Sequence, residues 1–166
     1  YTRTDPFWLS LGTISIWFKA SANQNGTLVG WGDNGNINFG SIEITANWTS
    51  SYADESLIAE TYTTSASQRA VIRKGNNYYS NGIWTNVTAV FDDNYLNLKI
   101  YVNGVSQTLT NNGGAHGGTA GWQIASNGND GEYWIGSIAS VQVYNKTLSQ
   151  AEVNQNFNAL RGKFGI

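Results

Sequence analysis

Short segments in which apolar and polar residues alternate run along most of the chain, and this two-residue period predicts β-strands. In residues 13–19, for example, Ile14, Ile16 and Phe18 fall on one side of the predicted strand. The segments that we expect to form strands are residues 13–19, 27–32, 37–44, 57–62, 69–74, 84–91, 95–103, 105–110, 122–125, 132–135 and 138–144. Turn-forming residues separate most of them, which is typical of antiparallel sheets.

Two of the turns predict hairpins. Residues 33–36 read Asp-Asn-Gly-Asn and separate two predicted strands. Asn103 and Gly104 suit a type I′ turn, because both central residues of that turn need a positive φ angle. In the strand before this turn, Leu98 and Ile100 share the expected core face, and Tyr101 lies on the face expected to meet solvent. Residues 105–110 are expected to return beside that strand.

One segment follows a helical period instead. Ser149 and Glu152 have the spacing of a capping box, in which each residue satisfies a backbone N–H of the other. Val153, Phe157 and Leu160 then form one apolar stripe that must dock on a sheet, and Gly162 is the expected stop. The pattern predicts an all-β fold: a two-layer antiparallel β-sandwich of the jelly-roll type, with one short C-terminal helix and a single domain over residues 1–166.

The composition agrees with a β-rich fold and removes several function classes. The 19 Gly residues favour tight turns, and only 12% of the 166 residues are charged. With nine basic and eleven acidic residues, the chain has no cluster of positive charge to bind nucleic acid. No apolar run approaches the roughly 20 residues that span a bilayer, so we expect no membrane insertion. The absence of cysteine excludes disulfide and thiol chemistry.

Catalytic chemistry finds no support in the motifs, and we expect the protein not to be an enzyme. A retaining glycoside hydrolase needs two carboxyl groups about 5 to 5.5 Å apart, and an alternating Glu-x-Asp-x-Glu strand would supply them. No such strand occurs, and Glu43, Glu60 and Glu132 stand apart. His116, the single histidine, lies in a glycine-rich loop without the signature of a base, a nucleophile or a zinc site. A hydrolase is kept only as a third alternative, because sandwich folds can host one.

Two loops carry the oxygen-rich side chains that a calcium ion prefers. One covers residues 33–38 and the other residues 127–130. The candidate calcium ligands are Asp33, Asn36, Asn129 and Asp130. The alternative is that these Asn and Asp residues stabilise turns through their own side chains.

Aromatic residues in predicted loops and at strand ends are the candidate contacts for a bound sugar. A sugar site needs a flat aromatic surface beside groups that hydrogen-bond the hydroxyls of the sugar. The candidate ligand-binding residues are Asn47, Trp48, Tyr52, Tyr78, Tyr79 and Trp122. Any of these aromatic rings can instead fill the core. The tryptophans that we assign to the core, because they lie inside predicted strands, are Trp17, Trp31, Trp84 and Trp134.

Three segments, taken in order, resemble one known superfamily. They are residues 13–32 with Trp-Phe-Lys, residues 84–105 with Tyr-Val-Asn-Gly, and residues 134–152 with Tyr-Asn-Lys-Thr-Leu-Ser. Together they are similar to the laminin G-like, concanavalin A-like lectin superfamily. The resemblance implies a jelly-roll sandwich that often holds one calcium at the rim, near Asp33 and Asp130. Residues 155–166 are similar to the ends of such domains in bacteriophage and other virus structural proteins.

These observations predict a non-catalytic carbohydrate-binding, lectin-like module, displayed on a virion or another extracellular structure for surface attachment. Its expected partner is a glycan such as a surface polysaccharide. The alternative is a structural decoration or assembly domain of a capsid, tail or fibre, whose partners are virion structural proteins. Burial of the aromatic candidates in a subunit contact would favour assembly, and an open groove would favour sugar binding. Either function is compatible with an oligomer.

Overall fold

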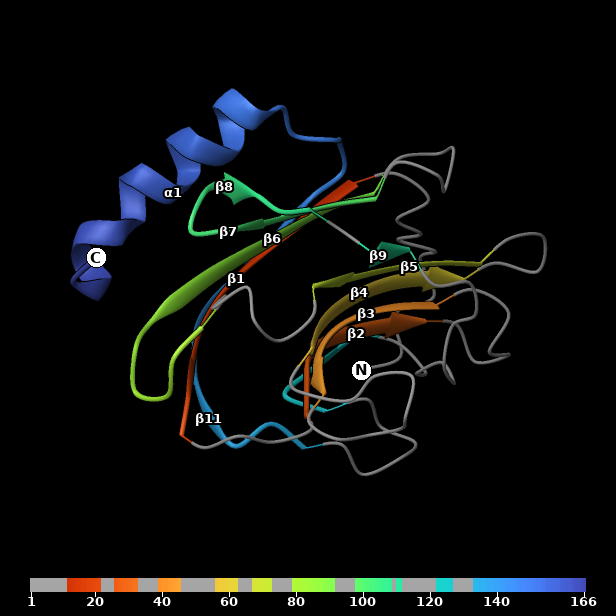
Figure 1. Ribbon diagram of the computed structural model, residues 1–166, viewed down its shortest axis with the longest axis horizontal. Coiled ribbons are helices and arrows are strands. Elements are labelled where there is room, and N and C mark those ends of the chain that lie inside the picture. The colour runs from red at the N-terminus through yellow and green to blue at the C-terminus, as the bar shows by residue number, and fades with distance from the viewer. Residues whose placement is uncertain are drawn as a thin grey trace.

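The strands form two antiparallel sheets that stack face to face (Figure 1). The computed structural model describes residues 12–21, 26–32, 39–45, 56–62, 67–72, 79–91, 98–108, 110–111, 122–126 and 133–166. In spatial order, the first sheet contains β11 (Gly136–Tyr144), β1 (Gly12–Ala20), β6 (Thr85–Phe91), β7 (Lys99–Val102) and β8 (Val105–Ser106). The second sheet contains β10 (Gln123–Ile124), β2 (Gly26–Gly32), β3 (Phe39–Thr45), β4 (Ser56–Tyr62), β5 (Ser67–Ile72) and β9 (Thr110–Asn111).

A single helix among the described residues, α1 (Gln150–Phe164), follows the last strand. Sheet order and helix position together confirm the predicted fold, an all-β, two-layer antiparallel sandwich with one C-terminal helix. The hairpin of β2 and β3 and the turn at Asn103 and Gly104 are also confirmed. In that turn the φ angles are 49° at Asn103 and 78° at Gly104, both positive as a type I′ turn requires.

The hydrophobic core lies between the two sheets. On β1, Ile14, Ile16 and Phe18 are completely buried, as the alternation in the sequence predicts. Leu57 and Ala59 of β4 are completely buried on the other side of the same cluster. Full burial of a side chain such as leucine or phenylalanine contributes about 1.5–3 kcal/mol. These contacts therefore supply the main force that holds the two sheets together.

Helix α1 covers the outer face of the first sheet (Figure 1). Trp17 of β1 points away from the core, and its indole stacks on Phe157 at 5.7 Å and on Phe164 at 4.1 Å between ring centroids. Val153 packs with Val90 of β6 in a second, smaller apolar cluster. As a result, every residue of β6 is buried, although only alternate residues face the main core.

Tyr101 of β7 departs from the prediction that it faces solvent. Its exposed fraction is only 4%, because it belongs to the small cluster that Leu148 and Val153 complete from the end of the chain. Burial raises the pKa of the Tyr101 hydroxyl. The two-residue period of the strand shows which residues share a face, but it does not show that a helix will cover that face.

A buried polar network lies on the same outer face. The Asn86 side-chain amide donates to the Ser15 hydroxyl (3.1 Å) and to the Ile16 carbonyl (3.2 Å). The Thr88 hydroxyl donates to the same Ser15 oxygen at 2.9 Å. A buried polar group without a partner costs about 1–3 kcal/mol, so these bonds let polar residues occupy a covered face and fix the pairing of β1 with β6.

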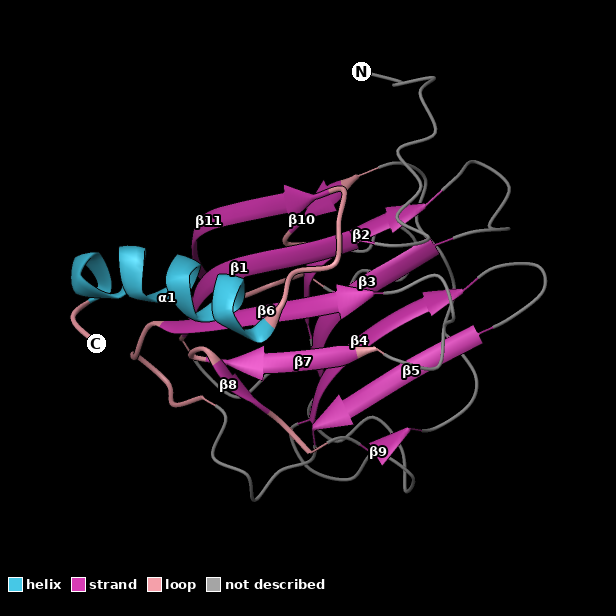
Figure 2. Cartoon of the chain, turned by 90° about the horizontal axis from the view of Figure 1, so that it is seen from above, coloured by secondary structure: helices cyan, strands magenta, loops and turns pink. Residues whose placement is uncertain are grey.

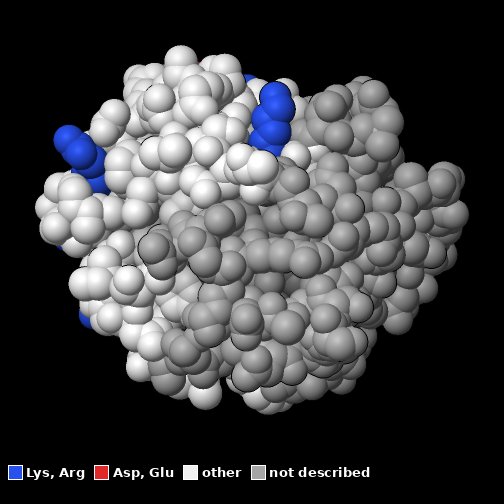
Figure 3. Space-filling model, viewed as in Figure 1, with Lys and Arg blue, Asp and Glu red and all other residues white. Residues whose placement is uncertain are grey.

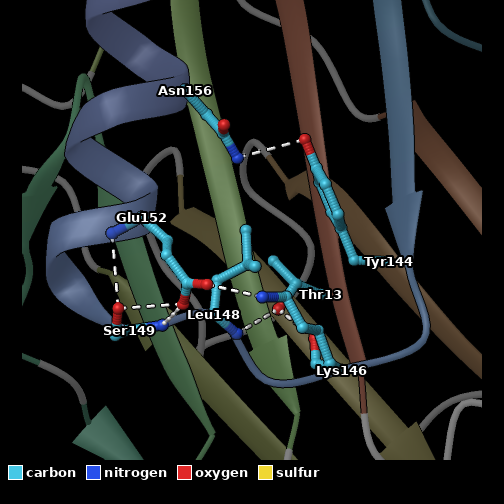
Figure 4. Close-up of polar contacts among 7 residues, drawn as sticks. All are labelled: Thr13, Tyr144, Lys146, Leu148, Ser149, Glu152 and Asn156. Atoms are coloured by element: carbon cyan, nitrogen blue, oxygen red, sulfur yellow. Dashed lines mark hydrogen bonds and ion pairs between the residues drawn. The ribbon is translucent and has the colours of Figure 1, made fainter.

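The start of α1 is fixed by the predicted capping box (Figure 4). The Ser149 hydroxyl accepts from the Glu152 N–H at 3.3 Å, and the Glu152 carboxylate accepts from the Ser149 N–H at 2.8 Å. The Lys146 ammonium forms an ion pair with the same carboxylate. The Lys146 contact, followed by the two Ser149 contacts, lowers the pKa of Glu152 to about 2.

Further hydrogen bonds tie this end of the chain to β1 and β11 (Figure 4). The Thr13 hydroxyl donates to the Lys146 carbonyl at 2.9 Å and accepts from the Leu148 N–H at 2.9 Å. The Asn156 side chain donates to the Tyr144 hydroxyl at 3.1 Å. One threonine near the start of the described chain therefore sets the path that leads into the helix.

The helix ends later than the sequence predicts. Gly162, the expected stop, lies inside α1, and Gly165 is the C-cap with a left-handed φ of 75°. The last turn persists because the Phe164 ring packs on Trp17 and, at 5.0 Å, on Trp84. Trp84 is half-buried at this contact and lies outside the main core, so its assignment to the core is wrong.

The return strand predicted over residues 105–110 is also shorter in the structure. Only Val105 and Ser106 pair with β7, while Thr110 pairs with Val71 in the second sheet. The Gln107 N–H still bonds to the Ile100 carbonyl at 3.0 Å. The chain therefore leaves the first sheet after Gln107 and crosses to the far edge of the second sheet.

Replacing Phe164 by alanine is expected to lower the free energy of unfolding by about 1–3 kcal/mol. A buried phenylalanine costs about 3–5 kcal/mol when truncated, and this ring is half-buried. Urea unfolding followed by tryptophan fluorescence measures the change. Asn158→Ala, at an exposed position of α1, is the control and should change stability by less than about 0.5 kcal/mol. Equal losses for the two variants would show that Phe164 does not hold the helix.

The contribution of the Glu152 charge to stability is expected to disappear at low pH. The pKa of Glu152 is lowered from 4.5 to about 2 on folding, so its stabilising effect is present above pH 4.5 and is lost as the pH falls through the interval toward 2. Urea unfolding of the wild type and of Glu152→Gln at several pH values measures this effect. The wild type should be the more stable at pH 7, and the difference should vanish near pH 2. A difference that is independent of pH would contradict the assignment.

Gly136 is expected to tolerate no side chain. A Cβ atom there would lie 2.3 Å from the Lys19 carbonyl oxygen and 2.9 Å from Nε1 of Trp134, so Gly136→Ala should cost about 1–3 kcal/mol of stability. Gly162→Ala is the matched control, because no atom lies within 4 Å of its Cβ position. That change should stabilise the helix by up to about 1 kcal/mol. Thermal unfolding of both variants measures whether each change lowers or raises the stability of the protein.

Candidate functional site

Most residues that the sequence nominates for ligand binding lie outside the described part of the chain. The sugar-contact candidates in this group are Asn47, Trp48, Tyr52 and Tyr78. The calcium candidates in this group are Asp33, Asn36, Asn129 and Asp130. Their roles stay predictions, and the structure brings together a different set of residues.

Tyr79 is described, and its ring packs against the core. The ring centroid lies 5.8 Å from that of Phe18, with an angle of 61° between the two planes. The residue as a whole is half-buried. The core therefore fixes the position of Tyr79, and its role in ligand binding stays a prediction.

Trp122, the remaining candidate, precedes β10 at the edge of the second sheet (Figure 2). Two residue pairs join β10 to β2, Gln123 with Gly30 and Ile124 with Val29. The exposed fraction is 38% for Trp122 and 56% for Ile124. Two large apolar side chains are thus open to solvent, one on this short edge strand and one just before it.

Trp134 holds the following segment against β10. The backbone N–H of Trp134 donates to the Ala125 carbonyl at 3.0 Å, and the backbone N–H of Ala125 donates to the Leu28 carbonyl at 3.1 Å. The Trp134 ring is buried edge-on against Phe18, with centroids 5.4 Å apart, which confirms its assignment to the core. The buried Nε1 of Trp134 has no hydrogen-bond partner among the described residues. The packing of the ring, together with its backbone bond, therefore fixes this segment.

The strand predicted over residues 132–135 is wrong where it is described, because residues 133–135 form a loop. Ala125, whose carbonyl accepts the hydrogen bond from Trp134, has a positive φ of 65°. This angle interrupts the extended backbone of the segment that pairs with residues 133–135. The alternation of the sequence nevertheless holds. Trp134 is buried, while Tyr133 and Ile135 have exposed fractions of 67% and 60%.

Four exposed side chains therefore gather on two segments that one hydrogen bond joins. We call them the β10 patch: Trp122, Ile124, Tyr133 and Ile135. Tryptophan and tyrosine rings combine a flat apolar face with a polar N–H or hydroxyl, which suits contact with sugars or with protein. None of the four carries a carboxylate, an imidazole or an amine.

Sequence reasoning found only Trp122 among these four residues. A signal for Tyr133 and Ile135 was present, because they flank a core tryptophan and the two-residue period puts them on the side opposite to it. The sequence pattern does not tell whether that side meets solvent or another layer of the fold. The exposure of Tyr133 and Ile135 therefore had to come from the structure.

Charged side chains do not define a site in the described part of the molecule. On the described surface of the face in Figure 3, Lys and Arg side chains lie singly rather than in a cluster. The described residues contain no group of three or more His, Cys, Asp or Glu side chains that could hold a metal ion. They also contain no helix of the length and hydrophobicity that a membrane span needs.

Solved structures with the same arrangement of sheets include several carbohydrate-binding domains. The CBM40 module of a Ruminococcus gnavus IT-sialidase has a TM-score of 0.60 and 17% identity, and the match covers 89% of this chain and 82% of that one. A putative carbohydrate-binding protein from Bacteroides ovatus has a TM-score of 0.64 and 15% identity, over 93% of this chain and 42% of that one. Domain 4 of the GH43 extracellular arabinanase AbnA from Geobacillus stearothermophilus has a TM-score of 0.58 and 18% identity, over 88% and 66%.

At these identities the likeness shows the fold alone, and the chain spans less than two thirds of the length of two of these three proteins. No sequence among the curated proteins matches the chain. A family model does match it, over residues 5–154, and that model describes the concanavalin A-like lectin/glucanases superfamily. The match covers most of the sequence, and the chain belongs to the concanavalin A-like lectin/glucanase superfamily.

Proposed function

We propose that this domain is a non-catalytic carbohydrate-binding module and that it contacts its glycan through the β10 patch. The observation that carries the proposal is the exposure of Trp122 and Tyr133, two aromatic rings at 38% and 67%, on segments that Trp134 holds in place. The apolar face of a sugar ring stacks on such side chains. Because buried packing fixes the backbone beneath the patch, little ordering is needed when a ligand binds.

The solved relatives support the ligand class. The Ruminococcus gnavus module was also solved bound to α2,6 sialyllactose, and the arabinanase domain was solved in complex with arabinotriose. These two sugars differ in charge and in ring type, so domains of this fold bind different glycans. For this chain the class that we propose is a surface polysaccharide.

Calcium is proposed as a second component of the site. In the sequence, Asn129 and Asp130 lie between Trp122 and Ile124 on one side and Tyr133 and Ile135 on the other, so an ion held by these two residues would be close in sequence to both parts of the β10 patch. Calcium prefers the carboxylate and amide oxygens that this loop and the loop of Asp33 and Asn36 supply.

The place of action that we propose is the surface of a virion or another extracellular structure, where the module would serve attachment. This proposal rests on the resemblance that the sequence analysis gives for residues 155–166. In this chain those residues form most of α1, which closes the outer face of the first sheet. The β10 patch lies at a sheet edge that the helix does not contact.

An assembly domain that binds protein is the second candidate function. The aliphatic side chains of Ile124 and Ile135, at 56% and 60% exposure, favour it, because branched aliphatic groups bury well against other protein surfaces and do not hydrogen-bond a sugar. In that case the β10 patch would be covered by a capsid, tail or fibre protein.

Trp122→Ala and Tyr133→Ala are each expected to weaken glycan binding about 2- to 12-fold, since an aromatic stacking contact contributes about 0.5–1.5 kcal/mol. A glycan array with and without calcium first finds a ligand, and calorimetric titration then measures its affinity for each variant. Val105→Ala is the control. It truncates an exposed apolar side chain on β8, an edge strand of the first sheet, and should leave the affinity for the glycan unchanged. No binding at millimolar sugar in either calcium condition would overturn the proposed function.

A further inference from the structure

A second exposed segment lies at the same end of the first sheet as residues 133–135 of the β10 patch. Residues 80–83 read Ser-Asn-Gly-Ile, all four are exposed, and the chain continues from them through Trp84 into β6. The exposed fraction of Ile83 is 53%. The end of β1, the start of β11 and the loop before β6 lie together at the lower left of Figure 1. We call residues 80–83 the Asn81 turn.

The same end of β1 holds both the Asn81 turn and the β10 patch. The Gly82 N–H donates to the Ala20 carbonyl at 2.8 Å, and the Ser21 N–H donates to the Ile135 carbonyl at 3.3 Å. β1 lies between β6 and β11 in the sheet, so the two segments flank it on opposite sides. The backbones of Gly82 and Ile135 are therefore separated by two strand spacings, about 10 Å. Ser21, which is exposed, lies between them.

One buried ring supports both segments from the core. The Phe18 ring packs against Trp134 of the patch segment, with centroids 5.4 Å apart, and against Tyr79, the residue before the Asn81 turn, at 5.8 Å. Phe18 is completely buried. Because the two surface segments are fixed to the same core residue, they keep their relative position when a ligand binds.

The Asn81 turn is closed by a hydrogen bond of its own. The Ile83 N–H donates to the Ser80 carbonyl at 3.1 Å, and Gly82 has a left-handed φ of 79°. A Cβ atom at Gly82 would meet no described atom within 4 Å beyond its neighbours in the chain, so glycine is needed there for its backbone angle and not for space. A turn fixed in this way presents Asn81 to a ligand at a small cost in ordering.

The exposed groups around the Asn81 turn complement those of the β10 patch. The side chains of the patch are aromatic or aliphatic and offer stacking surface. Asn81 carries a carboxamide that both donates and accepts hydrogen bonds, and Ser21 carries a hydroxyl that does the same. Ile83 adds an apolar contact. A glycan presents hydroxyls around an apolar ring face, so it needs both kinds of partner.

We propose that a glycan bound at the β10 patch continues over the end of β1 and contacts Ser21, Asn81 and Ile83. This inference rests on the proposed function and narrows its ligand class. A ligand that reaches from the aromatic rings to Asn81 extends beyond the roughly 10 Å that separate Ile135 from Gly82, and this length takes several linked sugar units. The ligand is therefore an inner stretch of a polysaccharide chain and not a single terminal sugar.

The test compares short and long fragments of the same polysaccharide. A glycan array carries arabinan, mannan, galactan, glucan and bacterial capsular polysaccharides, each as a disaccharide and as a hexasaccharide. Calorimetric titration then measures the affinity of the domain for both fragments of the glycan that binds. Wild-type protein should bind the hexasaccharide at least about 10-fold more tightly than the disaccharide, because only the longer fragment reaches the Asn81 turn.

Asn81→Ala and Ile83→Ala separate the two parts of the site. Each change should weaken binding of the hexasaccharide about 2- to 12-fold, as the loss of one contact does, and should leave the affinity for the disaccharide unchanged. Asn158→Ala and Val105→Ala are the matched controls. They truncate an amide and an aliphatic side chain at exposed positions of α1 and β8 and should change neither affinity.

The outcomes separate this inference from the proposed function. Equal affinities for the two fragments would overturn the extended site alone. So would a hexasaccharide affinity that Trp122→Ala lowers but that Asn81→Ala and Ile83→Ala leave unchanged. Absence of binding to every glycan would overturn the proposed function, and this inference with it.

Circular dichroism shows whether each variant is folded. If a variant does not fold, NMR of the isotope-labelled wild type decides. The backbone amides of Ser21 and of residues 81–83 should shift when the hexasaccharide is added and not when the disaccharide is added. Shifts that stay within the segments of the β10 patch for both fragments would exclude the contact.

Discussion

The first sheet needs a cover on its outer face, and the contact between Trp17 and helix α1 provides it. The outer face of β1 and β6 carries Trp17 and Val90 beside polar residues, and leaving these two apolar side chains in water would lose hydrophobic stabilisation. Phe157 and Phe164 stack on the Trp17 indole and complete the burial. The helix thereby closes one broad face of the sandwich, and ligands must approach from elsewhere, such as the edge where the β10 patch lies.

Elements controlled by local chemistry could be predicted from the sequence. The two-residue period gave the core residues Ile14, Ile16 and Phe18, Asn103 and Gly104 gave the tight turn, and Ser149 with Glu152 gave the helix start. The errors arose where a distant part of the chain decides the outcome. Tyr101 is buried by a helix formed about 50 residues later, and Gly162 stays helical because Phe164 packs on Trp17 and Trp84. No local pattern contains that information.

The candidate site was less predictable than the fold. Composition indicated that aromatic residues near strand ends are binding candidates, and Trp122 is exposed as such a residue should be. Tyr133 and Ile135 were missed, because their exposure depends on how Trp134 anchors its segment to Ala125 and Phe18. Residue type indicates which side chains are suited to a contact surface. Which of them meet solvent depends on which neighbouring side chains pack into the core.

The hydrogen bonds of Thr13 to Lys146 and Leu148 join residues 133 and 135 positions apart. During synthesis, at about 5–20 residues per second, α1 emerges on the order of 10 s after β1. Throughout that interval the Trp17 indole lacks the two phenylalanine rings that stack on it in the folded protein. Burial of that indole therefore depends on Phe157 and Phe164, which are synthesised after all of the strands of the first sheet.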